Sequence, residues 1–485
     1  MLEHSPILRA IQQHALESPQ ALALISSSKE QVTYSDLLER IMQAAAFLQA
    51  NGLRKGDCIA LSAQTELDFV YVYFAAHLLE VINVVVDANA NPKKLAYILD
   101  LTKPKLAFGF ETGKCVSLKY NQIEYGKQLE PIDVKYMSVD DTADIVFTTG
   151  TTGLPKGVML SHFNIFSSAD NINGFIGNSE HEVEVLGLPL CHSFGLGRLR
   201  CTLIKGATMV LVGSFANLKL FFGAMEEFHA TGFGMVPAVW AYIRKFSGTR
   251  ISKFANQLKY IEIGSATMPI DSKKELCELF PNTRICMHYG LTEASRSAFM
   301  EFHENMDKLN TIGKPVSEKV DIQIFDENGI KMANGEQGEI CVKGNMVTKS
   351  YFRQEENVNA FFGDYFRTGD VGYRDTDGNF YLAGRRKELI NVGGKKVSPQ
   401  EVEDAICSLG VEDCICIGME DPNGILGEVP KVYIVKNGTN MSFEEIRRKL
   451  LSLLEDYKIP VAFDWIDEIP KTSSGKKQRL SLRKS

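Results

Sequence analysis

Residues 145–157 read IVFTTGTTGLPKG, where an apolar run meets a segment of threonines and glycines that ends in Lys156 and Gly157. This pattern is typical of an anion-binding loop after a buried strand. Glycines let backbone N–H groups approach an anion closely, and successive N–H groups form a concave donor nest. The spacing of Gly150, Gly153, Lys156 and Gly157 does not fit the Walker loop GxxxxGK[ST]. The alternative is a flexible polar loop that binds nothing.

Outward from this loop, helical patterns alternate with short apolar runs. Residues 37–52 predict a helix that ends near Gly52, and residues 58–63 predict a strand. Further apolar runs are LGLPL (186–190), TMVLVG (208–213), FGMVP (233–237), YIEIG (260–264) and ICMHYG (285–290). Helical patterns at 217–230 and 271–280 separate them. The alternation predicts an α/β fold in which crossover helices join parallel strands.

After Lys314 the pattern changes to short runs broken by turn residues, which predict β-hairpins at 320–329, 338–344 and 378–384. From Lys387 onward the order is strand, helix (398–410), strand (414–419), strand (430–436), helix (442–457) and strand, enough for a compact unit. We therefore expect two domains. Residues 1–386 form a large N-terminal domain with mixed and parallel sheets and a β-rich subdomain, and residues 387–485 form a small, mobile α+β C-terminal domain.

Composition excludes several classes of protein. Hydrophobic residues make up 45% of the 485 residues and charged residues 23%, as in ordinary globular proteins. A net charge of −7 argues against a nucleic-acid partner, which needs a basic face. The start lacks a secretory signal, and His77, Glu80 and Asn83 interrupt the most apolar segment, 69–86, so we expect no integral membrane segment.

The cysteines and histidines show no metal or disulfide pattern. The ten cysteines are dispersed without CxxC spacing, and the nine histidines form no HxxxH or HExxH pair. We expect packed thiols in a reducing cytoplasm and no zinc site.

Four further motifs follow in order: YGLTE (289–293), FRTGD (366–370), GRRKELINVGGKKVSPQEVE (384–403) and PKTSSGKKQR (470–479). With the loop at 148–157 they resemble, over nearly the whole chain, the signature motifs of the adenylate-forming (AMP-binding) superfamily. The branch that they resemble is that of acyl-CoA synthetases, which are acid–thiol ligases. Thr149 stands where serine is usual in this family, and Phe366 where tyrosine is common.

The resemblance implies a site for ATP and Mg²⁺. The β- and γ-phosphates would be held by Thr148, Thr149, Gly150, Thr151, Thr152 and Lys156. Thr292 would contact the α-phosphate and Glu293 would coordinate Mg²⁺, a hard cation that prefers oxygen ligands. Taken alone, Glu293 is an ordinary carboxylate at the start of a helix.

The resemblance also implies the nucleoside site. Asp370 would accept hydrogen bonds from the ribose hydroxyls, and Arg385 would reach the ribose or the phosphates. Adenine would lie between Gly264-Ser265-Ala266 and Tyr289-Gly290. The alternatives are a turn aspartate, a surface arginine and tight packing at strand ends.

Catalysis would depend on Lys476, which the family places between the acyl carboxylate and the α-phosphate. Lys387 matches the family's hinge, about which the small domain turns. In the second orientation Gly393 and Gly394 would line the tunnel for the pantetheine arm of the acceptor. A solvated basic tail is the alternative for the cluster of lysines and arginines near Lys476.

The segment LPLCHSFGLG (188–197) resembles the motif on the substrate side of the family, with His192 near the acyl carboxylate. Cys191, His192 and Ser193 offer no anion to pair with a substrate ammonium, and an unpaired buried ammonium is costly. We therefore expect a small-molecule fatty, branched or aryl carboxylic acid rather than an α-amino acid.

Together these features predict an ATP-dependent acid–thiol ligase that forms acyl-AMP and then acyl-CoA. The chain ends soon after Lys476, so we expect free CoA, or the phosphopantetheine of a separate acyl carrier protein, as the acceptor. Loading of such a carrier protein is the alternative activity. A nucleotide-binding protein without catalysis is a further alternative, and a scaffold protein would leave the ordered motifs unexplained.

Overall fold

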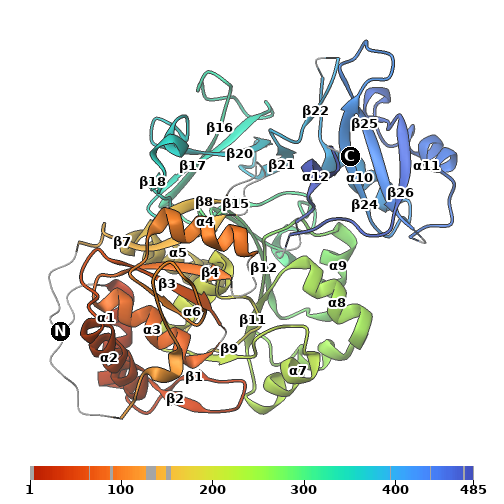
Figure 1. The fold of residues 1–485 in the computed structure, drawn as a ribbon. Coiled ribbons are helices and arrows are strands. Elements are labelled where there is room, and N and C mark those ends of the chain that lie inside the picture. The colour runs from red at the N-terminus through yellow and green to blue at the C-terminus, as the bar shows by residue number, and fades with distance from the viewer. Residues whose placement is uncertain are drawn as a thin grey trace.

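A computed structural model of the chain describes residues 5–64, 66–87, 91–126, 138–148, 155–393, 395–436, 438–472 and 476–483. A large N-terminal part, which runs to the end of β21 at Arg385, lies beside a smaller C-terminal part, which begins with β22 at Ile390 and is drawn in blue in Figure 1. The large part holds a nine-stranded, a seven-stranded and a five-stranded sheet, and the small part holds a three-stranded and a two-stranded sheet. The architecture is α/β with mixed sheets, as the sequence predicts.

The nine-stranded sheet is parallel at its centre. Its order is β15 (Lys314–Pro315), β14 (Ala298–Glu301), β13 (Arg284–Tyr289), β12 (Tyr260–Ile263), β11 (Gly232–Met235), β9 (Val183–Leu186), β10 (Thr208–Leu211), β1 (Leu22–Ile25) and β2 (Gln31–Thr33). The strand predicted at 186–190 is wrong in position, because β9 ends at Leu186. Buried Glu184 interrupts the apolar pattern of β9, and it pairs with Arg198 at 2.8 Å from Oε1 to Nε.

The seven-stranded sheet carries the threonine- and glycine-rich loop. Its order is β18 (Ser350–Tyr351), β8 (Lys156–Ser161), β7 (Thr142–Thr148), β4 (Ile82–Asp87), β3 (Cys58–Ala63), β5 (Leu106–Phe108) and β6 (Val116–Leu118). The strands from β7 to β6 pair in parallel, while β8 pairs antiparallel with both β7 and β18. The loop therefore joins two neighbouring antiparallel strands.

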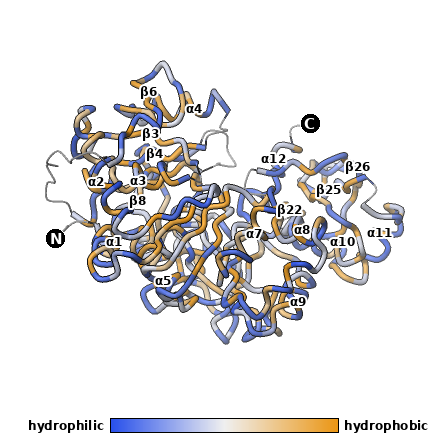
Figure 2. The backbone as a smooth tube through the Cα atoms, turned by 90° about the horizontal axis from the view of Figure 1, so that it is seen from below, coloured by the Kyte–Doolittle hydropathy of each residue, from blue (hydrophilic) through white to orange (hydrophobic). Residues whose placement is uncertain are grey.

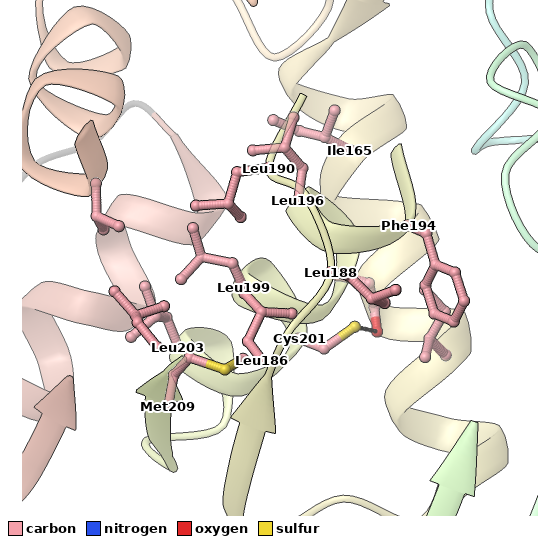
Figure 3. Close-up of a cluster of buried hydrophobic side chains, with 14 of the residues drawn as sticks. Ile165, Leu186, Leu188, Leu190, Phe194, Leu196, Leu199, Cys201, Leu203 and Met209 are labelled. Atoms are coloured by element: carbon pink, nitrogen blue, oxygen red, sulfur yellow. Dashed lines mark hydrogen bonds between the residues drawn. The ribbon is translucent and has the colours of Figure 1, made fainter. Parts of the chain in front are cut away.

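Helices cover these two sheets. They are α1 (Pro6–Glu17), α2 (Tyr34–Ala50), α3 (Leu67–Leu78), α4 (Pro92–Thr102), α5 (His162–Ile176), α6 (Ser193–Ile204), α7 (Leu218–Glu227), α8 (Pro237–Ser247) and α9 (Ile270–Leu279). The capping box of Thr33 and Asp36 starts α2, and Gly52 lies just beyond its end at φ +86°. Figure 3 shows Leu196, Leu199 and Leu203 of α6 in one apolar cluster with Leu186 of β9 and Met209 of β10. Hydrophobic segments gather in the middle of the large part and hydrophilic ones at its rim (Figure 2).

A buried ionic network fixes the strand that leads into the loop. Asp144 of β7 accepts hydrogen bonds from the Tyr73 hydroxyl at 2.8 Å and from His77 Nε2 at 2.9 Å, and it also pairs with Arg200 of α6. Burial alone would raise the pKa of Asp144, but the charges of Arg200 and His77 lower it to about 2. Removing one partner from such a network leaves a buried charge uncompensated, which is strongly destabilising.

The hairpins predicted after Lys314 form the five-stranded sheet. It orders β16 (Val320–Phe325), β17 (Gly338–Gly344), β20 (Tyr365–Arg374) and β19 (Phe361–Phe362), and β21 (Phe380–Arg385) also pairs with β20. All of these pairs are antiparallel.

The small part contains β22 (Ile390–Val392), β23 (Lys395–Val397), α10 (Pro399–Ser408), β24 (Cys414–Glu420), β25 (Glu428–Val435), α11 (Phe443–Leu450), β26 (Ala462–Ile466) and α12 (Arg479–Leu482). The helix predicted over 442–457 is too long. Ile446 and Leu450 are buried, whereas Leu451 and Leu453 are exposed, so the apolar face that stabilises the helix ends at Leu450.

Candidate active site

The two strands beside the loop bring its ends together. In the antiparallel pairing of β7 with β8, Thr148 lies opposite Lys156. The Lys156 ammonium lies 4.5 Å from the centroid of the Tyr351 ring. The other predicted phosphate-binding residues lie outside the described residues: Thr149, Gly150, Thr151 and Thr152.

Thr292 and Glu293 lie in the turn between β13 and β14. Gly290 permits this turn, because a Cβ there would lie 2.4 Å from the backbone nitrogen of Arg296. Glu293 Oε1 accepts a 2.8 Å hydrogen bond from the Tyr351 hydroxyl, while Oε2 has no hydrogen-bond partner among the described residues. One carboxylate oxygen is thus oriented and the other is available, an arrangement that fits a hard divalent cation shared with phosphate oxygens.

Tyr289, Asp370 and Arg385 meet where the nine-stranded and five-stranded sheets approach each other. The Tyr289 hydroxyl donates to Asp370 Oδ2 at 2.7 Å, and Arg385 Nε lies 2.6 Å from Oδ1. Burial, and then the charge of Asp370, raise the pKa of Tyr289, so the phenol stays a donor. The predicted ribose-binding residues therefore form one connected group.

The segment Gly264-Ser265-Ala266 follows β12, and Gly264 lies against the ring of His288. A Cβ on Gly264 would lie 2.0 Å from His288 Cε1, so only glycine fits. Ser265 has φ +72°, which is uncommon for a residue other than glycine. His288 is held by Glu262, with Nδ1 2.7 Å from Oε1. The small residue predicted beside adenine thus also accommodates this imidazole.

His192 is the residue before α6 and is half buried. Burial lowers its pKa, as do Lys94 and Lys476, whereas Asp87 raises it. Sequence reasoning missed Asp87. It lies at the end of β4, more than a hundred residues from the LPLCHSFGLG segment, so no local pattern connects it to His192.

Arg296 is a second residue that the motifs did not identify. It is 2% exposed, and it donates from Nη1 to the Ser193 carbonyl at 2.9 Å and from Nη2 to the Phe194 carbonyl at 3.1 Å. It therefore connects the first turn of α6, next to His192, with the turn that carries Glu293. In the sequence, its position three residues after Glu293 could have indicated that it lies near the site.

Lys476 comes from the small part, and charged residues of the large part influence its pKa. Burial by surrounding protein, and then the charge of Arg385, lower its pKa, while Asp370 and Glu293 raise it. The side chain stays accessible to solvent. Its backbone is tied to Thr472: Lys476 N–H donates to Thr472 Oγ1 at 3.1 Å, and Thr472 N–H donates to the Lys476 carbonyl at 2.8 Å.

The next residue, Lys477, points into the small part. Its ammonium lies 2.9 Å from Glu403 Oε2 and 2.9 Å from Asp413 Oδ1, and Arg479 Nη2 also reaches Glu403 Oε2 at 2.9 Å. Burial opposes the charge of Lys477, but Glu403 and Asp413 raise its pKa. Lys477 therefore ties the backbone next to Lys476 to the small part.

The predicted hinge lies between β21 and β22, where Lys387 is exposed. The preceding backbone is held to the large part by Arg386 N–H, which donates to the Gly369 carbonyl at 2.9 Å. Gly393 has φ +56° and donates to the Leu426 carbonyl at 2.8 Å. Gly394 lies outside the described residues.

Three features of the described part of the chain concern membranes, metal ions and cysteines. There, no helix is both long and apolar enough to cross a membrane. No group of three or more histidine, cysteine or acidic side chains is arranged there to hold a metal ion. The ten cysteines are free thiols.

Comparisons with known proteins show a likeness to CoA ligases. The chain is 32% identical over 485 residues to a 2-succinylbenzoate–CoA ligase of Bacillus velezensis, covering 97% of this chain and 96% of that protein. It is 30% identical to an oxalate–CoA ligase of Arabidopsis thaliana, with coverage of 96% and 95%. The structure of Bacillus subtilis O-succinylbenzoate coenzyme A synthetase in complex with ATP and a magnesium ion superposes with a TM-score of 0.89. That protein is 29% identical, and the match covers 98% of this chain and 99% of that one.

Family descriptions cover both parts of the chain. Residues 401–476 match the C-terminal domain of AMP-binding enzymes, and residues 11–352 match the AMP-binding enzyme description. The chain therefore belongs to the AMP-binding enzyme family, in its CoA ligase branch.

Proposed function

We propose that the enzyme joins a carboxylic acid to CoA in two steps that share one site. The acid's carboxylate attacks the α-phosphorus of ATP, which yields acyl-AMP and releases pyrophosphate. The thiolate of CoA then attacks the acyl carbon and displaces AMP. The observation that carries this proposal is the connected group of Tyr289, Asp370 and Arg385, in which Asp370 lies 2.7 Å from the Tyr289 hydroxyl and 2.6 Å from Arg385 Nε.

In the first step two anions must approach each other, so positive charge and oriented donors have to lie where negative charge develops. The Lys476 ammonium would bridge the acyl carboxylate and the α-phosphate. Thr148 and Lys156 would hold the outer phosphates, and Thr292 the α-phosphate. A bound Mg²⁺, held by Glu293, would act as a Lewis acid on the phosphate oxygens. Asp370 and Arg385 would hold the ribose.

The second step requires the small part to turn. We place the domain boundary at 386–387, with Lys387 as the hinge, so that Lys476 leaves the site and Gly393-Gly394 approach it. Two separate hydrophobic clusters support this boundary: one ends at Phe380, and the other begins at Ile390. Hinges are a few residues that absorb a large change in backbone dihedral angles.

We propose an aryl acid, with 2-succinylbenzoate as the first candidate, because a ligase for that acid shares 32% of its residues with this chain. The oxalate–CoA ligase is nearly as similar, so small dicarboxylic acids are the second candidate. An α-amino acid, which Cys191, His192 and Ser193 disfavour, is the negative control.

The test is pyrophosphate release with MgATP and each acid, with and without CoA. We expect multiple turnovers only for an accepted acid and only with CoA, because acyl-AMP would otherwise stay bound. Release that stays stoichiometric with CoA but turns over with an acyl carrier protein would identify the carrier as acceptor. Nucleotide binding without release for any acid would contradict the proposed reaction.

A further inference from the structure

Tyr351 lies between two residues to which the proposed function gives roles in binding MgATP. Its hydroxyl is 2.8 Å from Glu293 Oε1, and its ring centroid is 4.5 Å from the Lys156 ammonium. The side chain is 5% exposed. It belongs to none of the motifs found in the sequence, and the hairpin region around it gives no sign of a role at the site.

The backbone holds Tyr351 firmly in this place. In the pairing of β18 with β8, Tyr351 lies opposite Val158, two residues after Lys156. Tyr351 N–H donates to Asn357 Oδ1 at 2.7 Å, and Thr348 N–H donates to the Glu293 carbonyl at 2.8 Å. The segment 348–357 therefore fixes the turn that carries Glu293 relative to the strand that begins at Lys156.

The two contacts act on different groups. An ionised carboxylate can only accept hydrogen bonds, so the phenol must donate to Glu293 Oε1, which directs Oε2 away from Tyr351. The face of an aromatic ring carries partial negative charge and attracts the Lys156 ammonium. One side chain thus orients an anion and a cation that lie on separate elements.

We propose that Tyr351 is a positioning residue for the metal–nucleotide complex: its hydroxyl orients the Glu293 carboxylate so that one oxygen faces the divalent cation. This inference rests on the proposed function, in which Glu293 is the metal ligand. Partners that orient metal ligands in this way typically affect metal affinity by about 10- to 100-fold.

The experiment measures the affinity of the full-length protein for α,β-methylene-ATP by calorimetry, once with Mg²⁺ and once with a chelator. Tyr351→Phe removes the hydroxyl and keeps the ring that Lys156 faces. We expect about a tenfold loss of affinity for the Mg²⁺ complex and unchanged affinity for the metal-free nucleotide. Tyr34→Phe is the matched control, because it removes another buried hydroxyl, whose partner is the Ala207 carbonyl, outside the site.

Two results for Tyr351→Phe would overturn the inference: equal losses for both forms of the nucleotide, or no loss for either. Glu293→Gln separates the inference from the function beneath it. If Glu293→Gln loses affinity only for the Mg²⁺ complex and Tyr351→Phe does not, the role of Tyr351 is refuted and Glu293 keeps its assignment. If Glu293→Gln binds the Mg²⁺ complex normally, both assignments are refuted.

Discussion

The hydroxyl of Tyr289 donates a 2.7 Å hydrogen bond to Oδ2 of Asp370. Tyr289 ends β13 and Asp370 lies in β20, so this bond connects the nine-stranded sheet to the five-stranded one. Arg385 holds the other oxygen of Asp370 from β21. The carboxylate is therefore oriented before ATP arrives, and its remaining lone pairs can accept the ribose hydroxyls.

Asp370→Asn should weaken ATP binding, because a neutral amide is a poorer acceptor for the ribose hydroxyls. We expect a loss of about 2 kcal/mol of binding free energy, typical of a hydrogen bond to a charged group. An ATP titration measures it. Asp375→Asn is the control, since Asp375 accepts hydrogen bonds from the Asn379 and Asp377 N–H groups in the turn after β20. Equal ATP affinity for Asp370→Asn and the wild type would contradict the ribose assignment.

Lys476→Ala should lose acyl-AMP formation, because the ammonium would stabilise the transition state. The protein should stay folded, because the side chain of Lys476 is accessible to solvent. The expected loss is roughly 2.7–4 kcal/mol, as for other single transition-state donors. Single-turnover pyrophosphate release measures the rate. Lys436→Ala, which removes a lysine from an exposed pair with Asp467, should keep the wild-type rate. Normal acyl-AMP formation by Lys476→Ala would exclude its catalytic role.

Adenylation should decline at high pH. A lysine acts as a cation only below its pKa, and burial and Arg385 hold the pKa of Lys476 below the ordinary 10.5. The rate should therefore fall as the pH rises through a value below 10.5. Lys476→Arg should be slower but should lack this decline, since a guanidinium stays protonated there. Identical pH profiles for the two proteins would show that another group causes the decline.

Gly264→Ala should impair the enzyme, since the new methyl group would lie 2.0 Å from His288 Cε1. The ring or the backbone must then shift. We expect lower acyl-AMP formation and a lower melting temperature. In the double variant Gly264→Ala, His288→Ser, serine is smaller than the imidazole. The double variant should therefore regain part of the acyl-AMP formation and part of the melting temperature. A double variant no better than Gly264→Ala alone would mean that contacts other than the imidazole require the glycine.

Lys477→Ala should destabilise the small part, in contrast to Lys476→Ala. Its ammonium is one of the partners of Glu403, which is 1% exposed. Loss of this charged hydrogen bond should cost about 2 kcal/mol of unfolding free energy. Thermal denaturation of the two single variants makes the comparison. If Lys477→Ala and Lys476→Ala melt at the same temperature, Lys477 does not stabilise the small part more than Lys476 does.

The sequence predicted the alternation of strands and helices because most of these elements have continuous apolar patterns, as in β3 (Cys58–Ala63). It misplaced β9, where buried Glu184 breaks the pattern, because the compensating Arg198 lies on another element. It extended α11 too far, because a run of leucines does not reveal which of them reach a core.

The motifs predicted one site for Tyr289, Asp370, Arg385 and Lys476, although nearly two hundred residues separate the first from the last. Contacts join the first three. The motifs could not identify Tyr351, Arg296 or Asp87. Tyr351 and Arg296 make contacts with distant elements, Asp87 influences the pKa of His192 from another strand, and the local sequence of all three is ordinary. The domain boundary at 386–387 and the roles of the site residues remain predictions to be tested by the variants above.

The two hydrophobic clusters have no residue in common, and a single stretch of backbone after Arg385 joins them. Each part therefore has a core of its own. Because the small part has the smaller core, we expect it to lose its order at a lower temperature than the sheets that carry Glu293 and Asp370. Inactivation at temperatures that unfold only the small part would be reversible on cooling, because the larger core would stay buried and would not aggregate.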